Sequence, residues 1–129
     1  LRYSFDGGHD PIISDKEDMA YPYIMASEGR PSVFWKDLLW YGLEDDIVWQ
    51  MALRAEMAKG GSVRIQDLNP SFTSGNGGDL FVMTRNGLSN GASDGLVLAL
   101  NDNPNAESSA WVNSPFSNKF LKDYSDGYL

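Results

Sequence analysis

A histidine beside an aspartate is the pair of side chains in this sequence best suited to chemistry on a ligand. His9 is the only histidine of the chain, and Asp10 follows it. The two residues come directly after a pair of glycines at residues 7–8. Glycines let the backbone take conformations closed to other residues and let a ligand approach closely. The apolar residues before the glycines predict a short strand over residues 3–6. The loop that follows this strand carries His9 and Asp10.

Taken alone, this pair does not distinguish a catalytic site from a loop pair that is solvated or hydrogen-bonded for structural reasons. Histidine and aspartate are both ordinary loop residues. Two readings of different class therefore stand at this point: an enzyme site, or a turn in a domain without catalysis. The elements around the loop are needed to choose between them.

A helix and a buried strand are predicted to follow the loop. Ser14 and Glu17 have the spacing of a capping box, which predicts a helix from about 15 to 27. Pro22 falls inside it and removes one backbone hydrogen bond. The apolar run at residues 32–35 is typical of a strand covered on both faces, as in parallel sheets. The predicted core stripe of the helix consists of Met19, Tyr23 and Ala26.

A second, longer helix is the clearest element of the sequence. It begins with the acidic residues from Glu44 onward and is stopped by the glycine pair at 60–61, a charge order that complements the helix dipole. Its apolar face, predicted to pack on the sheet, consists of Ile47, Val48, Met51, Ala52, Ala55 and Ala58. A loop over residues 36–43 precedes it. Trp40 and Tyr41 in that loop either stack on the ring of a ligand or simply pack.

Short β-like runs separated by turn residues occupy the chain after the glycine pair at 60–61. The runs are residues 63–68, 80–85, 96–100, 111–112 and 119–124, with turns at 86–87, 90–91 and 94–95. They predict an antiparallel β domain over 61–129, separate from residues 1–60. Oxygen ligands for calcium are available on Asp79, Asp94, Asp102 and Asn103, but without the spacing of a recognised calcium loop, so turn chemistry explains them.

Charge and composition narrow the range of partners. The net charge is −8 and the sequence pI is about 4.4. Both argue against nucleic acid and against an anionic membrane, which attract clustered Lys and Arg. No stretch reaches 18 apolar residues and no leader of the secretory type opens the chain, so neither a membrane span nor a signal peptide is expected. The absence of cysteine excludes disulfides and thiolate chemistry.

Three consecutive segments, residues 5–10, 20–25 and 29–35, resemble the alpha-amylase family of glycoside hydrolases in order and spacing. That family has Phe-x-x-Asn-His-Asp after the seventh strand of its barrel, a helix reading roughly Ala-Tyr-Ala-Tyr-Ile, and an eighth strand Gly-x-Pro-x-Val-Phe-Tyr. The resemblance covers about residues 3–60. It implies an α/β part followed by an all-β part: the C-terminal portion of a (β/α)8 barrel, then an incomplete antiparallel β domain.

The resemblance also implies an activity and a role for two residues. Asp10 matches the third aspartate of the family, which stabilises the transition state, and His9 matches the neighbouring sugar-binding histidine. The nucleophile and the acid/base come from the fourth and fifth strands, which this chain lacks. A barrel needs roughly 250 residues, and the chain has 129 and begins with leucine, so we expect a fragment that is inactive alone.

The implied substrate is an α-glucan or maltooligosaccharide. No cofactor is evident in this segment, although the resemblance implies that the intact parent can bind calcium and can be secreted. A non-catalytic relative, or a carbohydrate-binding or structural domain, is the alternative. An aspartate nucleophile and a glutamate acid upstream would distinguish the enzyme from that alternative.

Overall fold

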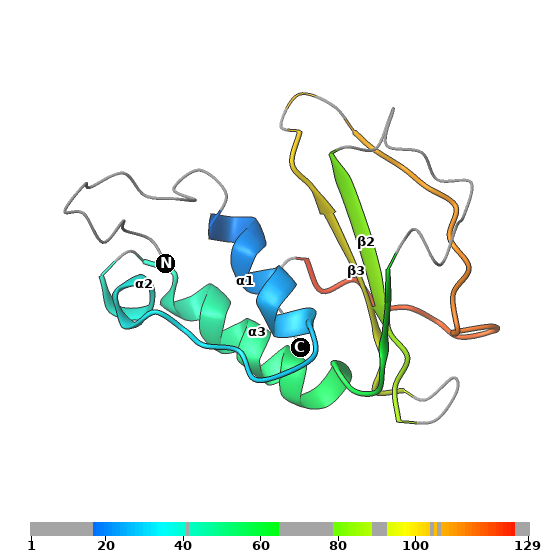
Figure 1. The fold of residues 1–129 in the computed structure, drawn as a ribbon, viewed down its shortest axis with the longest axis horizontal. Coiled ribbons are helices and arrows are strands. Elements are labelled where there is room, and N and C mark those ends of the chain that lie inside the picture. The colour runs from blue at the N-terminus through cyan, green and yellow to red at the C-terminus, as the bar shows by residue number, and fades with distance from the viewer. Residues whose placement is uncertain are drawn as a thin grey trace.

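The computed structural model describes residues 17–40, 42–64, 79–88, 93–103, 105 and 107–125. Within these residues the chain forms three helices followed by a three-stranded antiparallel sheet (Figure 1). The helices are α1 (Glu17–Ala26), α2 (Trp35–Leu39) and α3 (Glu44–Met57), and the strands are β1 (Ser62–Arg64), β2 (Leu80–Arg85) and β3 (Leu96–Asn101). None of the described helices is long and apolar enough to span a membrane.

The sheet is a meander with β2 in the centre. Met83 of β2 pairs with Arg64 on one side and with Leu98 on the other, and both pairings are antiparallel. This confirms the prediction of an antiparallel sheet after the helices, and β2 has the predicted bounds. Alternation along β2 gives the sheet two different faces: one carries Phe81 and Arg85 and contacts the helices, and the other packs against the chain after residue 107.

Two predicted strands at the end of the chain are wrong. Residues 111–112 and 119–124 have irregular backbone in the structure. Residues 110–112 cover the face of β2 that points away from the helices. Ala110 and Val112 pack on Leu80 and Val82 through their side chains and do not form backbone pairs with the strand. Trp111 points away and is 94 % exposed. The side chains of residues 110–112 are thus alternately packed and exposed, as in a strand, although this segment does not pair with one.

The helices α1 and α3 confirm two of the predicted elements, and their core faces agree with the predicted ones in part. Ala26, Ile47 and Ala58 are buried as predicted, whereas Met51 is exposed. The apolar core between them consists of Tyr21, Met25 and Ile47. Tyr23, predicted in the core stripe, is exposed and meets Phe81 of the sheet edge to face at 5.4 Å. Val48, predicted on the buried face of α3, is also exposed.

The sequence predicts that α3 packs on a parallel sheet that includes residues 3–6, which lie outside the described residues, so that contact stays a prediction. α1 lies between the antiparallel sheet and α3 (Figure 1), and α3 packs mainly on α1 and α2. Pro22 is accommodated inside α1, and the helix continues to Ala26.

The predicted buried strand at residues 32–35 is also wrong. Residues 30–34 are irregular, and Trp35 begins the short helix α2, which the sequence analysis assigned to a loop. Phe34 and Trp35 are 38 % and 49 % exposed. An apolar run becomes a strand only where neighbouring strands accept its backbone hydrogen bonds, and none lies beside it within the described residues.

A tight glycine turn joins α3 to the sheet, where the domain boundary was predicted. Gly60 has φ +76°, a conformation that favours glycine. Backbone bonds tie this turn to the sheet: the Gly87 amide donates to the Lys59 carbonyl at 2.9 Å, and the Asn86 amide donates to the Gly61 carbonyl at 3.0 Å. The boundary at 60–61 remains a prediction, and the structure adds that hydrogen bonds connect the two sides of it.

The turn supports a first testable prediction. Gly60→Ala should destabilise the chain by at least about 1–3 kcal/mol, because alanine is strained at positive φ and its Cβ would overlap the backbone of Gly87. Gly61→Ala is the matched control, since a Cβ at Gly61 meets open space. Urea denaturation of both variants measures the difference. Equal stabilities would contradict the turn geometry.

Candidate functional site

The sequence-predicted site residues His9 and Asp10 lie outside the described residues, as does Tyr41. The described residues contain no group of three or more His, Cys, Asp or Glu side chains placed to hold a metal ion. Two of the calcium candidates accept hydrogen bonds. Asp79 accepts one from the side-chain amide of Asn103 at 2.9 Å, and Asp94 accepts one from the backbone amide of Leu88 at 3.2 Å. These contacts stabilise the turns at the ends of β2 and β3.

The two most exposed aromatic side chains described in the helical part, Trp35 and Trp40, lie at α2. The aromatic cluster at this place consists of Phe34, Trp35 and Trp40, with Lys36 between the two indoles. The rings of Trp35 and Trp40 meet edge to face, with centroids 4.8 Å apart and planes at 77°. Phe34 lies 6.4 Å from Trp35. The Lys36 ammonium lies 5.8 Å from the Trp35 ring centre and 5.1 Å from that of Trp40, within cation–π range.

A buried carboxylate anchors the aromatic cluster to the helical core. Asp37 is 7 % exposed, and its Oδ2 accepts a hydrogen bond of 2.5 Å from the Tyr21 hydroxyl on α1. The same hydroxyl oxygen accepts from the Phe34 backbone amide at 3.4 Å. A buried carboxylate without such a partner would be costly. The bond between Tyr21 and Asp37 therefore holds α2 against α1, and α2 carries the two indoles.

A second polar group lies at the C-terminal end of α1. The Arg54 guanidinium, on α3, donates to the carbonyl oxygens of Met25, Ser27 and Gly29, the Ser27 bond being 2.7 Å. The last carbonyls of a helix have no partner within the helix, so a cation at this end satisfies them and complements the helix dipole. The five donors of an arginine fork suit this arrangement.

Arg85 of β2 reaches the same end of α1 from the sheet. It donates to the Ala26 carbonyl at 2.9 Å and, through two nitrogens, to the Gly60 carbonyl at 3.0 and 2.6 Å. Its side chain is 6 % exposed, and burial lowers the pKa of the guanidinium. We call Arg54 and Arg85 the arginine clasp, because together they join α1 to α3, to the glycine turn and to β2.

Glu28 adds a contact beside the arginine clasp. Its carboxylate accepts from both the hydroxyl and the backbone amide of Ser62 at the start of β1, at 2.7 and 2.6 Å. These Ser62 donors lower the pKa of the Glu28 carboxyl. The loop after α1 is therefore fastened to the sheet as well as to α3.

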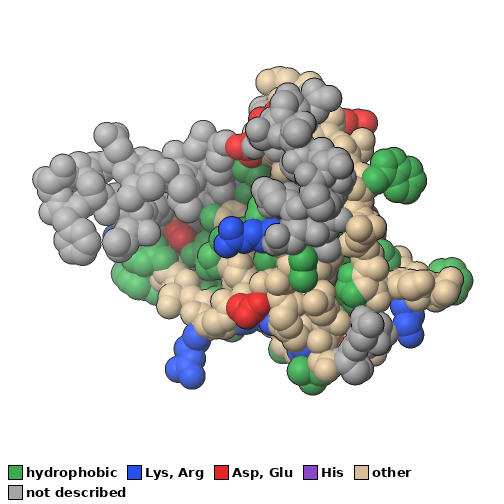
Figure 2. Space-filling view, turned by 45° about the vertical axis from the view of Figure 1, so that its right-hand side comes forward, with side chains coloured by type: hydrophobic (Ala, Val, Ile, Leu, Met, Phe, Trp, Pro, Cys, Tyr) green, Lys and Arg blue, Asp and Glu red, His purple; other side chains and the backbone are tan. Residues whose placement is uncertain are grey.

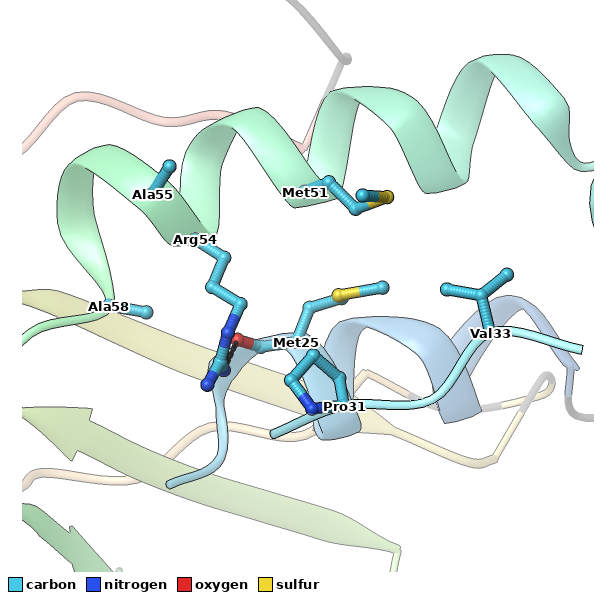
Figure 3. Close-up of a pocket in the computed structure, with 7 residues that line it drawn as sticks. All are labelled: Met25, Pro31, Val33, Met51, Arg54, Ala55 and Ala58. Atoms are coloured by element: carbon cyan, nitrogen blue, oxygen red, sulfur yellow. Dashed lines mark hydrogen bonds between the residues drawn. The ribbon is translucent and has the colours of Figure 1, made fainter. Parts of the chain in front are cut away.

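A shallow hollow of about 300 Å³ lies between α1, α3 and the segment before α2 (Figure 3). Its walls are apolar apart from Arg54, and Figure 3 shows the guanidinium turned to the Met25 carbonyl. That guanidinium, the charged group in the lining, already donates to three backbone carbonyls and so holds the helix end. The lining residues are Met25, Pro31, Val33, Met51, Arg54, Ala55 and Ala58.

Among the described residues, the aromatic cluster is a more suitable ligand surface than the hollow, because its indoles are exposed. The two arginines of the arginine clasp bind backbone carbonyls and hold the helices and the sheet together. Sequence reasoning left open whether Trp40 stacks on a ligand or simply packs, placed Trp35 in a buried strand and did not single out Arg85. Comparison with family models, curated proteins and solved structures finds no match for the chain.

Proposed function

We propose that this chain is the C-terminal part of a retaining glycoside hydrolase of the alpha-amylase type, acting on α-glucans. The observation that carries the proposal is the order and spacing of three sequence segments, residues 5–10, 20–25 and 29–35. In this proposal residues 1–60 complete a (β/α)8 barrel, and residues 61–129 belong to the β domain that follows it.

The order of the elements supports this proposal. α1 and α3 fall where the last two barrel helices are expected, and the antiparallel sheet follows the second of them. In this proposal the stretch at residues 30–34, which is irregular in this chain, belongs to the eighth strand of the barrel. A barrel strand needs a neighbour on each side, and a whole barrel needs roughly 250 residues, so the stretch would pair only in the longer protein.

The proposed chemistry is a double displacement at the anomeric carbon. A carboxylate nucleophile and a second carboxyl group, acting first as acid and then as base, flank the glycosidic bond. Both come from the upstream part of the proposed enzyme. Asp10 would accept hydrogen bonds from the sugar hydroxyls at the cleaved ring and favour its distorted, oxocarbenium-like transition state. His9 would donate to a hydroxyl of the same ring.

A carbohydrate-binding domain without catalysis is the second candidate function. The exposed indoles of Trp35 and Trp40 favour it, because aromatic faces held at a surface bind the apolar face of sugars without any catalytic group. The two candidates share the ligand class and differ in turnover.

Turnover of a chromogenic maltooligosaccharide tests the proposed function. The intact enzyme, expressed from the longer reading frame, should hydrolyse it. The 129-residue chain alone should give none, because a third carboxylate acts only beside a nucleophile and an acid. Activity of the isolated chain would refute the fragment proposal, and an inactive intact protein that still binds the oligosaccharide would favour the second candidate.

A further inference from the structure

We infer that the aromatic cluster at α2 is a binding platform for a neutral glucan chain. The ligand class rests on the proposed function, whereas the platform itself is argued from the structure. Trp35 and Trp40 are 49 % and 64 % exposed, although indoles of this size are usually largely buried in soluble proteins. Two exposed indoles in contact are therefore a surface feature to be explained.

The geometry of the two indoles suits a sugar. Their planes stand at 77°, so the rings form a corner whose two walls face different directions. A pyranose presents C–H groups on its face and hydroxyls around its edge. It can stack its face on the exposed surface of one indole, with the Lys36 ammonium that lies between the two rings at its edge. This is the usual combination of an apolar wall and few polar groups in a ligand site.

The charge of the cluster favours a neutral, hydroxyl-rich ligand. Lys36 lies between the indoles and supplies an ammonium that can donate to sugar hydroxyls. The neighbouring Asp37 carboxylate is buried and accepts a hydrogen bond from Tyr21, so it is largely shielded from a ligand at this surface. An anionic ligand would meet the repulsion of a chain with net charge −8, whereas a neutral glucan meets none.

The size of the cluster favours a small ligand over a protein partner. A stable protein interface takes roughly 20–30 residues on each side. The aromatic cluster and the exposed Leu39 beside it lie within one short segment, residues 34–40. In the view of Figure 2, exposed apolar side chains appear at separate places rather than as one broad face.

The base of the platform is rigid, which favours affinity. The Tyr21 to Asp37 bond and the Phe34 amide bond to the same hydroxyl hold α2 on α1. A preorganised site loses less conformational entropy on binding. The platform therefore needs no rearrangement to accept a ligand.

Isothermal titration calorimetry of the full 129-residue chain with maltoheptaose measures the binding affinity and so tests the platform. Trp40→Ala should weaken binding at least tenfold, and Trp40→Phe, which keeps an aromatic face, should stay within about threefold of the parent chain. Trp111→Ala is the matched control: Trp111 is a more exposed indole on the far side of the sheet, and its loss should change the affinity less than twofold.

Several outcomes would overturn the platform: no maltoheptaose binding by the parent chain, equal affinity after Trp40→Ala, or an equal loss after Trp111→Ala. Far-UV circular dichroism of Trp40→Ala and retained binding by Trp40→Phe separate a lost contact from a lost fold. This experiment measures binding only. A chain that binds through Trp40 while the intact protein has no glycosidase activity would uphold the platform and refute the enzyme proposal.

Discussion

In the proposed intact enzyme, Asp10→Asn is expected to lower kcat and kcat/KM together, by about 10- to 150-fold. A hydrogen bond to a charged group is worth roughly 1.5–3 kcal/mol, which converts to that range in rate, and a preorganised site can exceed it. If the carboxylate holds the sugar hydroxyls more tightly in the transition state than in the ground state, KM changes little. Steady-state kinetics on a maltooligosaccharide gives both constants.

Two neighbouring substitutions serve as comparisons for Asp10→Asn. His9→Ala should cost less, because it removes a neutral donor at the same ring. Asp6→Asn should be nearly silent, since Asp6 lies outside the motif positions assigned to the sugar. Activity within twofold of the parent after Asp10→Asn, together with loss of activity after Asp6→Asn, would mean that the motif is misaligned and that the catalytic assignment is wrong.

The elements that sequence reasoning located are those whose signals are local. α3 has an acidic first turn, an apolar face and a glycine stop, all within its own length or just beyond it. β2 is a six-residue run of strand formers bounded by a turn at Asn86. Each needs no distant partner to be recognised, which is why the start of α3 and both ends of β2 agree with the structure, although α3 ends at Met57, before the glycine stop.

The run at residues 32–35 was misread because its composition fits two environments. Consecutive apolar residues are typical of a strand covered on both faces, but the same composition also suits an exposed aromatic surface on a short helix. Only the neighbours decide between them. Within the described residues Phe34 and Trp35 have no strand beside them, and α2 begins at Trp35.

The polar contacts that hold the molecule together could not be read from the sequence at all. Tyr21 and Asp37 are 16 residues apart, and Arg85 and Ala26 are 59 apart. No short motif links such residues, because their partners are backbone carbonyls and side chains that meet only after the chain has folded. Arginine is common on protein surfaces, so its burial in β2 carries no compositional signal.

Loss of the Arg85 side chain is expected to have the largest effect on stability. Arg85→Met should lower the free energy of unfolding by roughly 3–6 kcal/mol, because it removes charged donors from the carbonyls of Ala26 and Gly60, at about 1.5–3 kcal/mol for each carbonyl. Domains of this kind are stable by only about 5–15 kcal/mol in total. Urea denaturation of the 129-residue chain measures the change, and hydrogen exchange in α1 locates it.

The clasp geometry makes Arg85→Lys an informative companion variant. A lysine keeps the charge but offers a single ammonium, which cannot span both carbonyls as the planar fork does. It should therefore recover only part of the stability lost in Arg85→Met. Arg64→Met is the matched control, since Arg64 is exposed on β1, and surface substitutions of this kind usually stay within about 0.5 kcal/mol of the parent. If Arg85→Met destabilised the chain no more than Arg64→Met, the arginine clasp would not be what joins the sheet to α1.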